Sequence, residues 1–373
     1  MSIKFVNTPS LEGMDAQITP VVGENPLCRI PSVRALYTAV SRQELMDHKP
    51  GTVQGFVLAF EEGLKNIVFA NLDCRHDHFK LVNTVAEAVR TAVEMHSQNI
   101  FVPVGTDFTD EEVSLICQGL MIGAYRFDLY KTEKSPKVRF TVYSERDYSA
   151  AVQNGKMLGE CTNLARDLVN PPGSDMTPVV LAQKAAAQAE LCGVKYEIFD
   201  EFEIEKMGMG SFLAVARGSV NPPRLIVLRY QGDPENDSTV ALVGKGITFD
   251  TGGYDIKDDE SMSTMKSDMG GAAAVIGAVL AIARAGIKAN VTAVVAACEN
   301  RVSGNAYLPG DVLRTMSGKT VEVINTDAEG RLTLIDAVTY AVQKENAFAV
   351  IDIATLTGGQ VVSLGYRYAA LIS

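Results

Sequence analysis

The segment 240–332 of this 373-residue chain sets carboxylates and lysines among glycines, and it limits the possible folds more than any other segment. The apolar, β-branched run 239–243 has the length of a buried strand and leads directly into Gly244, Lys245 and Gly246. We therefore expect Lys245 at a strand end. Polar residues in such a place are typical of a site rather than of a core.

Two further acids follow along the chain. Asp250 precedes Gly252 and Gly253, a turn that lets the backbone pass close to whatever the carboxylate holds. Asp268 comes just before 270–286, where small and aliphatic residues recur with helical spacing. Taken alone, Asp268 would be interpreted as a helix cap or a first-turn acid, because exposed N–H groups and the helix dipole favour a carboxylate there.

The last two acids lie in the sequence NTDAEGRL at 325–332, which follows a predicted strand at 291–298 and precedes a helical pattern to about residue 342. Asp327 and Glu329 are two positions apart, and in an extended segment this spacing turns both carboxylates the same way. Four carboxylates and a lysine thus gather at strand ends and turns. Oxygen ligands of this kind suit divalent cations, and carboxylates able to bridge suit two of them.

The positions of the histidines limit the catalytic mechanisms that the chain can use. The four histidines are His48, His76, His78 and His96, so the later part of the chain cannot build an HExxH site or a histidine-activated nucleophile. A hydrolase located there must use carboxylates and metal. We interpret the pair His76 and His78 as a solvated helix start, since two ligands without a third nearby fall short of a zinc site.

Composition excludes several other classes. The net charge of −11 argues against a nucleic-acid surface as the main role, and 47% hydrophobic content is ample for large cores. The first residues have no apolar signal core, and no window reaches the roughly 18 uninterrupted apolar residues of a membrane span. The six cysteines show no CxxC or finger spacing and indicate buried thiols of a reducing compartment. These features predict a soluble cytoplasmic enzyme.

The pattern along the chain predicts an α/β fold in two domains. Residues 1–148 form a smaller N-terminal α/β domain, with strands at 54–60, 65–70, 99–104 and 137–143 and helices at 78–96 and 109–123. Residues 149–170 form a linker helix, ended by Asn170-Pro171-Pro172-Gly173. Residues 171–373 form the second domain, with a helix at 177–191 and strands at 194–199 and 224–230, which indicate a mostly parallel sheet.

The motifs now quoted resemble those of the leucyl aminopeptidase family, the M17 type of dinuclear metallopeptidase that includes the peptidase B branch. NTDAEGRL matches the family signature without a change, and VGKGITFDTGG, IK and MKSDMGGAA match at the expected spacings. The resemblance extends more weakly from ARDLVNPPGSDMTP (165–178) to DIATLTGG (352–359).

The resemblance implies two divalent metal ions per chain, Zn²⁺ or Mn²⁺. The implied metal ligands are Lys245, Asp250, Asp268, Asp327 and Glu329. The first ion would be held by Lys245, Asp268 and the two bridging residues, Asp250 and Glu329, and the second by Asp327 and the same bridging pair. Lys245 can coordinate only as the neutral amine, a form that two nearby dications and partial burial favour by lowering its pKa.

Other roles also come from the resemblance. Lys257 matches the catalytic lysine, and Arg331 the catalytic arginine, which holds a bicarbonate. The implied substrate-binding residues are Met265, Asn325, Ala328, Thr355, Leu356 and Gly358. The family more often has Ser at Asp255 and Pro at Asp258, so the loop that carries Lys257 is more acidic than usual here.

The implied reaction is release of N-terminal amino acids from peptides, with a water activated by two metals and the substrate's free α-amino group on one of them. The implied assembly is a homohexamer. Family members continue for several dozen to about a hundred residues beyond the point that matches Ser373, so we expect a C-terminally incomplete catalytic domain. Two alternatives are a catalytically silent structural or regulatory relative, and a metal-dependent phosphohydrolase, which leaves the NTDAEGRL match unexplained.

Overall fold

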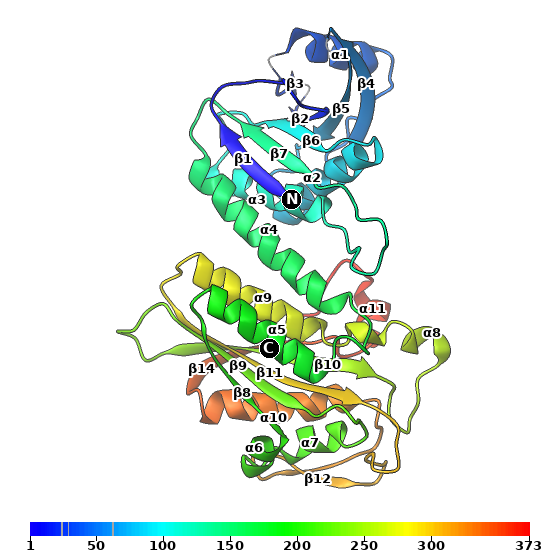
Figure 1. Cartoon of the computed structure of the whole chain (residues 1–373), viewed down its shortest axis with the longest axis vertical. Coiled ribbons are helices and arrows are strands. Elements are labelled where there is room, and N and C mark those ends of the chain that lie inside the picture. The colour runs from blue at the N-terminus through cyan, green and yellow to red at the C-terminus, as the bar shows by residue number, and fades with distance from the viewer. Residues whose placement is uncertain (24, 29, 62) are drawn as a thin grey trace. The chain divides into compact units, whose positions relative to one another are not determined.

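The computed structural model describes residues 1–23, 25–28, 30–61 and 63–373, which divide into two compact units, Met1–Asn163 and Leu164–Ser373 (Figure 1). The division falls inside helix α4 (Ser149–Val169), the segment predicted as a linker helix. Both units combine strands and helices, so the α/β fold class predicted from the sequence is confirmed.

The first unit contains a mixed sheet with the strand order β1-β7-β6-β2-β5-β4, in which β3 pairs with β2. Its strands are β1 (Ser2–Val6), β2 (Ala16–Val22), β3 (Asn25–Pro26), β4 (Val53–Phe60), β5 (Gly63–Asn71), β6 (Asn99–Pro103) and β7 (Arg139–Tyr143). Its helices, besides the first part of α4, are α1 (Pro31–Arg42), α2 (His78–Glu94) and α3 (Asp110–Gly123). The four strands and two helices predicted here are confirmed.

The sequence patterns missed β1, β2, β3 and α1 in this unit. Strand β2 shows why. It contains Pro20, which cannot donate to a ladder, and the buried polar residues Gln17 and Thr19 interrupt its apolar run. The Gln17 amide nitrogen donates to Thr19 Oγ1 at 2.8 Å, so these two buried side chains bond one another inside the unit.

Helix α2 begins where the sequence predicts. Asp77 is its N-cap, with a side chain that accepts a hydrogen bond from Lys80 N at 3.0 Å. His76 and His78 flank this cap and are both exposed. The interpretation of this pair as a solvated helix start is therefore confirmed.

The second unit is built on a sheet with the order β14-β10-β11-β9-β8. The strands are β8 (Lys195–Phe199), β9 (Arg224–Gln231), β10 (Thr239–Asp250), β11 (Asn290–Asn300) and β14 (Ala347–Ile353). Strand β10 runs parallel to both of its neighbours, β11 and β14, whereas β9 and β8 join in antiparallel pairings. Because parallel strands end at the same edge, β10 and β11 bring their carboxyl ends together.

Helices cover both faces of this sheet (Figure 1). On one face α5 (Pro178–Leu191) and α9 (Gly270–Arg284) bury an apolar core that includes Leu181, Val275 and Leu228. On the other face α6 (Glu201–Lys206), α7 (Gly210–Ala216) and α10 (Glu329–Gln343) bury a second core that includes Phe212 and Ala337. A small hairpin, β12 (Val312–Arg314) with β13 (Thr320–Glu322), lies outside the main sheet.

The segment Met265–Arg284 is apolar and long enough to cross a membrane by length and composition alone. It includes α9, whose residues Ala272, Val275, Ile276 and Val279 are completely buried in the second unit. Its composition is explained by this core position, on one face of the sheet beside α5.

One local irregularity in β10 decides the orientation of the polar residues. The prediction that Lys245 lies at a strand end is wrong, because β10 continues to Asp250. The pairing with β11 shifts between Ile247 and Phe249, so Thr248 is an extra residue in the ladder. Lys245 and Asp250, five positions apart, would otherwise face opposite sides of the strand. The bulge adds one residue and turns both toward the same region.

A candidate dinuclear metal centre

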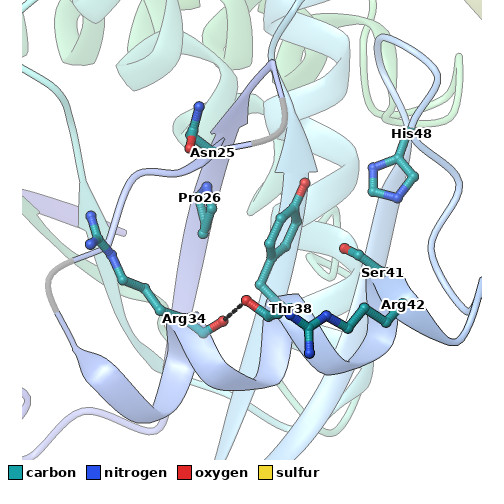
Figure 2. Close-up of a pocket in the computed structure, with 8 residues that line it drawn as sticks. Asn25, Pro26, Arg34, Thr38, Ser41, Arg42 and His48 are labelled. Carbon is teal, nitrogen blue, oxygen red and sulfur yellow. Dashed lines mark hydrogen bonds between the residues drawn. The ribbon is translucent and has the colours of Figure 1, made fainter.

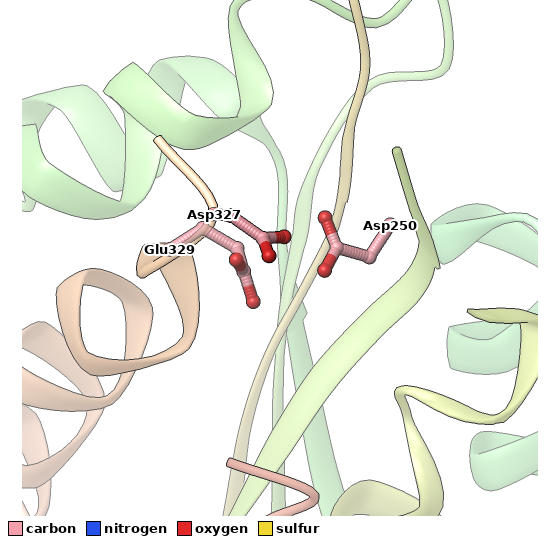
Figure 3. A group of neighbouring side chains, drawn as sticks. All are labelled: Asp250, Asp327 and Glu329. Atoms are coloured by element: carbon pink, nitrogen blue, oxygen red, sulfur yellow. The ribbon is translucent and has the colours of Figure 1, made fainter. Parts of the chain in front are cut away.

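Three carboxylates converge beyond the end of β10. One oxygen from each of Asp250, Asp327 and Glu329 lies within 4.8 Å of the others, and Figure 3 shows the three groups facing a common space. Asp250 is the last residue of β10, and Glu329 is the first residue of α10. A divalent cation needs this kind of oxygen cluster.

The segment that carries Asp327 is not extended, so the physical reason given above for its pairing with Glu329 is wrong. Asn325 Oδ1 accepts a hydrogen bond from Asp327 N at 2.6 Å, and Ala328 has φ −110° and ψ 36°. A turn followed by the first residue of α10 therefore brings the two carboxylates together. The helix start also places Glu329 beside unpaired backbone N–H groups, which favour a carboxylate.

Lys245 lies on the other side of Glu329 and is 4% exposed. Its Nζ is 2.8 Å from Glu329 Oε1 and 2.9 Å from Asp268 Oδ2, and it donates to the Thr355 carbonyl at 3.1 Å. Thr355 Oγ1 in turn donates to Asp268 Oδ1 at 2.8 Å. The sequence-predicted ligands Lys245, Asp268 and Glu329 thus form one connected group.

Two glycines allow this close approach. A Cβ at Gly271 would lie 1.9 Å from the Ile353 carbonyl oxygen, so glycine lets α9 pack against β14 next to Asp268. A Cβ at Gly330 would lie 2.9 Å from Lys245 Cε and 3.0 Å from Leu356 Cδ1. Glycine at 330 therefore leaves room for the lysine side chain between β10 and α10.

Burial and neighbouring charges shift the pKa values of this group in opposite directions. Burial lowers the pKa of Lys245, but the negative charges of Asp268 and Glu329 outweigh it, and the net pKa is raised. Burial is also the main cause that raises the pKa of Asp268 to about 7 and the pKa of Glu329 above its ordinary value. Without a metal, Lys245 is therefore an ammonium group, and a coordinated metal would have to take the place of one of its protons.

Lys257 makes the equivalent contacts on the second side of the cluster. Its Nζ is 2.9 Å from Asp250 Oδ2 and 2.5 Å from Asp327 Oδ1. Burial lowers the pKa of Lys257, but its hydrogen bonds to Asp327 and Asp250 outweigh this effect and raise it. Lys257 therefore carries its positive charge at neutral pH, next to two of the predicted ligands.

The donor set fits a pair of hard divalent cations. It comprises four carboxylates, three of them nearly fully buried, together with a lysine amine. Within the described residues Glu329 Oε2 is buried and has no hydrogen-bond partner, which is costly unless a cation supplies one. Asp250 Oδ1 accepts from Gly252 N and from Asn300 Nδ2, both at 2.8 Å, and so leaves Oδ2 toward the cluster.

The remaining predicted residues lie around this centre with different degrees of contact. Leu356 is 46% exposed and lies against Gly330, beside Lys245. Met265 begins the short helix η1 (Met265–Ser267), and Ala328 precedes α10; both are half-buried. Arg331 is exposed on the first turn of α10, and Gly358 is exposed just before α11 (Gly359–Leu364). Among the described ion pairs none joins Arg331 to the four acids.

The sequence interpretation missed Asn300 and Tyr307. Asn300 ends β11 and is completely buried, and Tyr307 is 1% exposed. Both donate to the Thr326 carbonyl, at 3.0 Å and 2.7 Å. The only sequence signal was an asparagine just beyond the predicted strand 291–298, and such a residue is more often a turn former.

The first unit contains a separate cavity of about 510 Å³. Its lining residues are Asn25, Pro26, Arg34, Tyr37, Thr38, Ser41, Arg42 and His48. Figure 2 shows that the guanidinium groups of Arg34 and Arg42 do not point toward one another. None of the sequence-predicted site residues lies there.

Known proteins are similar to this chain over most of its length. Residues 163–373 match the cytosol aminopeptidase family, catalytic domain. A probable cytosol aminopeptidase of Clostridium perfringens is 41% identical over 96% of this chain and 76% of its own length. Another from Alkaliphilus metalliredigens is 46% identical over 79% of this chain, which spans 61% of that relative.

Two solved structures are also similar to this chain. The bottromycin maturation enzyme BotP is 30% identical, with a TM-score of 0.79 over 95% of this chain and 74% of BotP. The complex of BotP with Mn gives a TM-score of 0.80 at the same identity. Together with the carboxylate and lysine cluster, these matches show that the chain belongs to the cytosol aminopeptidase family.

Proposed function

We propose that this protein is a metal-dependent aminopeptidase of the leucyl aminopeptidase type, which releases N-terminal amino acids from peptides. The observation that carries the proposal is the convergence of Asp250, Asp327 and Glu329, with one oxygen of each within 4.8 Å of the others, next to two buried or half-buried lysines. The Mn complex of BotP and the family match support the same assignment.

The proposed ligands are the five residues inferred from the sequence. Lys245, Asp268, Asp250 and Glu329 would hold one divalent ion, and Asp250, Asp327 and Glu329 the other, as Zn²⁺ or Mn²⁺. When bound, such a pair supplies an activated water at neutral pH without a histidine. Lys245 must lose a proton to act as a ligand, whereas Asp250 and Glu329 each have a second oxygen with which to bridge.

Lys257 is the proposed electrophilic residue. Its ammonium group already lies between Asp250 and Asp327, so it would face the scissile carbonyl of a peptide bound over the centre. There it would donate to the carbonyl oxygen and stabilise the negative charge that develops on it. Exposed Arg331 has a planar guanidinium fork that suits a bicarbonate, which would accept and return protons during the reaction.

Removal of metal tests the proposal directly. We expect prolonged dialysis against a chelator to abolish hydrolysis of leucine p-nitroanilide, because no described residue near the cluster is a histidine-activated nucleophile. Addition of Mn²⁺ or Zn²⁺ should restore the rate. Activity that survives complete removal of metal would contradict the proposal. A protein that binds two ions but hydrolyses no peptide would support a catalytically silent relative instead.

We further propose that the protein is cytoplasmic and self-associates as a homohexamer. Both proposals rest on the family resemblance, and a net charge of −11 is compatible with them. Light scattering on the full-length protein is expected to give the mass of six chains. A monomer at micromolar concentration would contradict the assembly.

A further inference from the structure

Thr326 holds the turn before Asp327 in place, and all of its polar groups are bonded. The residue is completely buried. Its N–H donates to Asp255 Oδ2 at 2.7 Å, and its Oγ1 accepts from Asp255 N at 2.8 Å while it donates to the Gly252 carbonyl at 2.7 Å. Asp255 and Thr326 therefore bond reciprocally, the backbone of each to the side chain of the other.

The carbonyl of Thr326 is held from the opposite side. It accepts from Asn300 Nδ2 at 3.0 Å and from the Tyr307 hydroxyl at 2.7 Å. The same Asn300 nitrogen donates to Asp250 Oδ1 at 2.8 Å. Because both partners of this nitrogen are acceptors, the orientation of the amide is fixed. One buried amide thus ties Asp250 to the peptide that leads into Asp327.

These contacts connect two loops that bear predicted catalytic groups. The first loop, 252–257, follows Asp250 and ends at Lys257; the second, 325–327, ends at Asp327. We call Asp255, Asn300, Tyr307 and Thr326 the Thr326 clasp. The clasp spans the same two loops as Lys257, whose Nζ lies between Asp250 and Asp327. Small shifts of either loop would change both the metal-binding oxygens and the place of the ammonium group.

We propose that Asp255 is a positioning residue, which acts through the Thr326 clasp to set the spacing of Asp250, Asp327 and Lys257. The inference rests on the proposed function, because the spacing matters only if these groups bind ions and substrate. Asp255 itself bonds Thr326 and none of the four acids among the described contacts. Its effect is therefore transmitted by hydrogen bonds and not by ligation.

A competing explanation is charge alone, since any carboxylate close to the cluster attracts cations. The amide of Asp255→Asn distinguishes the two, because its oxygen can accept from Thr326 N as Oδ2 does now, but it carries no charge. Asp255→Ala removes both the charge and the acceptor. Asp259→Asn removes one charge from the exposed first turn of the neighbouring helix α8 (Asp259–Met262) and serves as the matched control.

The experiment titrates the metal-free proteins with Mn²⁺ by calorimetry and then measures peptide hydrolysis at saturating Mn²⁺. For Asp255→Ala we expect the weaker Mn²⁺ step to lose about tenfold in affinity and kcat to fall about tenfold, with KM little changed, as for other residues that orient metal ligands. Asp255→Asn should recover to within about threefold of the wild type in both measurements, as the bonded geometry is kept. Asp259→Asn should match the wild type.

Two results would overturn the inference. Equal losses in the alanine and asparagine variants would show that the effect comes from charge. Wild-type Mn²⁺ binding and kcat in both variants would show that Asp255 has no positioning role. If Asp255→Ala failed to fold, Asp255→Val, which also lacks both the charge and the acceptor, would take its place. If the wild type binds Mn²⁺ and hydrolyses peptide and all variants equal it, only the role of the Thr326 clasp is contradicted. If the wild type neither binds Mn²⁺ nor hydrolyses peptide, the proposed function is contradicted as well.

Discussion

Lys257→Ala should retain two metal ions per chain and lower kcat by a factor of about 10² to 10³, the size expected for the loss of one oxyanion stabiliser. The reason lies in its contacts. Lys257 bonds Asp250 and Asp327, so its positive charge competes with a cation for the same oxygens. Removal of the ammonium group therefore leaves every proposed ligand in place. Metal analysis beside steady-state kinetics on leucine p-nitroanilide measures both quantities.

Lys245→Ala is the matched comparison, because it removes the other lysine of the same cluster. Lys245 is almost fully buried between Asp268 and Glu329, and we propose it as a ligand. Its variant should bind one ion less tightly and lose activity for that reason. If Lys257→Ala lost its metal ions and recovered turnover at high metal concentration, while Lys245→Ala kept both ions, the two lysines would have to exchange roles.

The sequence predicted four of the five strands of the main sheet in the second unit, and the helices α5, α9 and α10, because these elements are locally consistent. Helix α5 begins with Pro178 after the N-cap Thr177. Helices α9 and α10 contain small and aliphatic residues at helical spacing. The residues could be selected as a candidate site because carboxylates and lysines among glycines are hard to explain by core packing or by surface solvation, and the family resemblance then implied their roles as ligands. The contacts of Lys245, Asp268, Asp327 and Glu329 fit that selection of residues.

Local geometry was less accessible to sequence analysis. The extra residue Thr248 lies beyond the apolar run 239–243 that predicted the strand, and only the pairing with β11 reveals the bulge. The turn at Asn325–Asp327 depends on a side chain that bonds backbone two residues on, which a period-two pattern cannot represent. Asn300 and Tyr307 act across long sequence separations on a single carbonyl. Such contacts come from tertiary structure and leave no periodic signal.

Replacement of the proposed bridging carboxylate should have the largest effect of all. In Asp250→Asn the amide oxygen can still accept from Gly252 N and Asn300 Nδ2, so the turn after β10 should persist. The amide nitrogen would replace Oδ2, which is the atom that now contacts Lys257. A neutral group that presents a donor to a cation cannot bridge two ions, so we expect metal stoichiometry to fall below two.

The rate of peptide hydrolysis by Asp250→Asn should fall by about 10³-fold or more, since an activated water lowers the activation free energy by several kcal/mol. Asp259→Asn removes the same charge from an exposed position nearby and should leave both quantities unchanged. Thermal melting of the metal-free proteins checks that the substitution has not unfolded the second unit. Two tightly bound ions in Asp250→Asn, with turnover near that of the wild type, would show that Asp250 does not bridge. Glu329 would then be the only proposed bridging ligand.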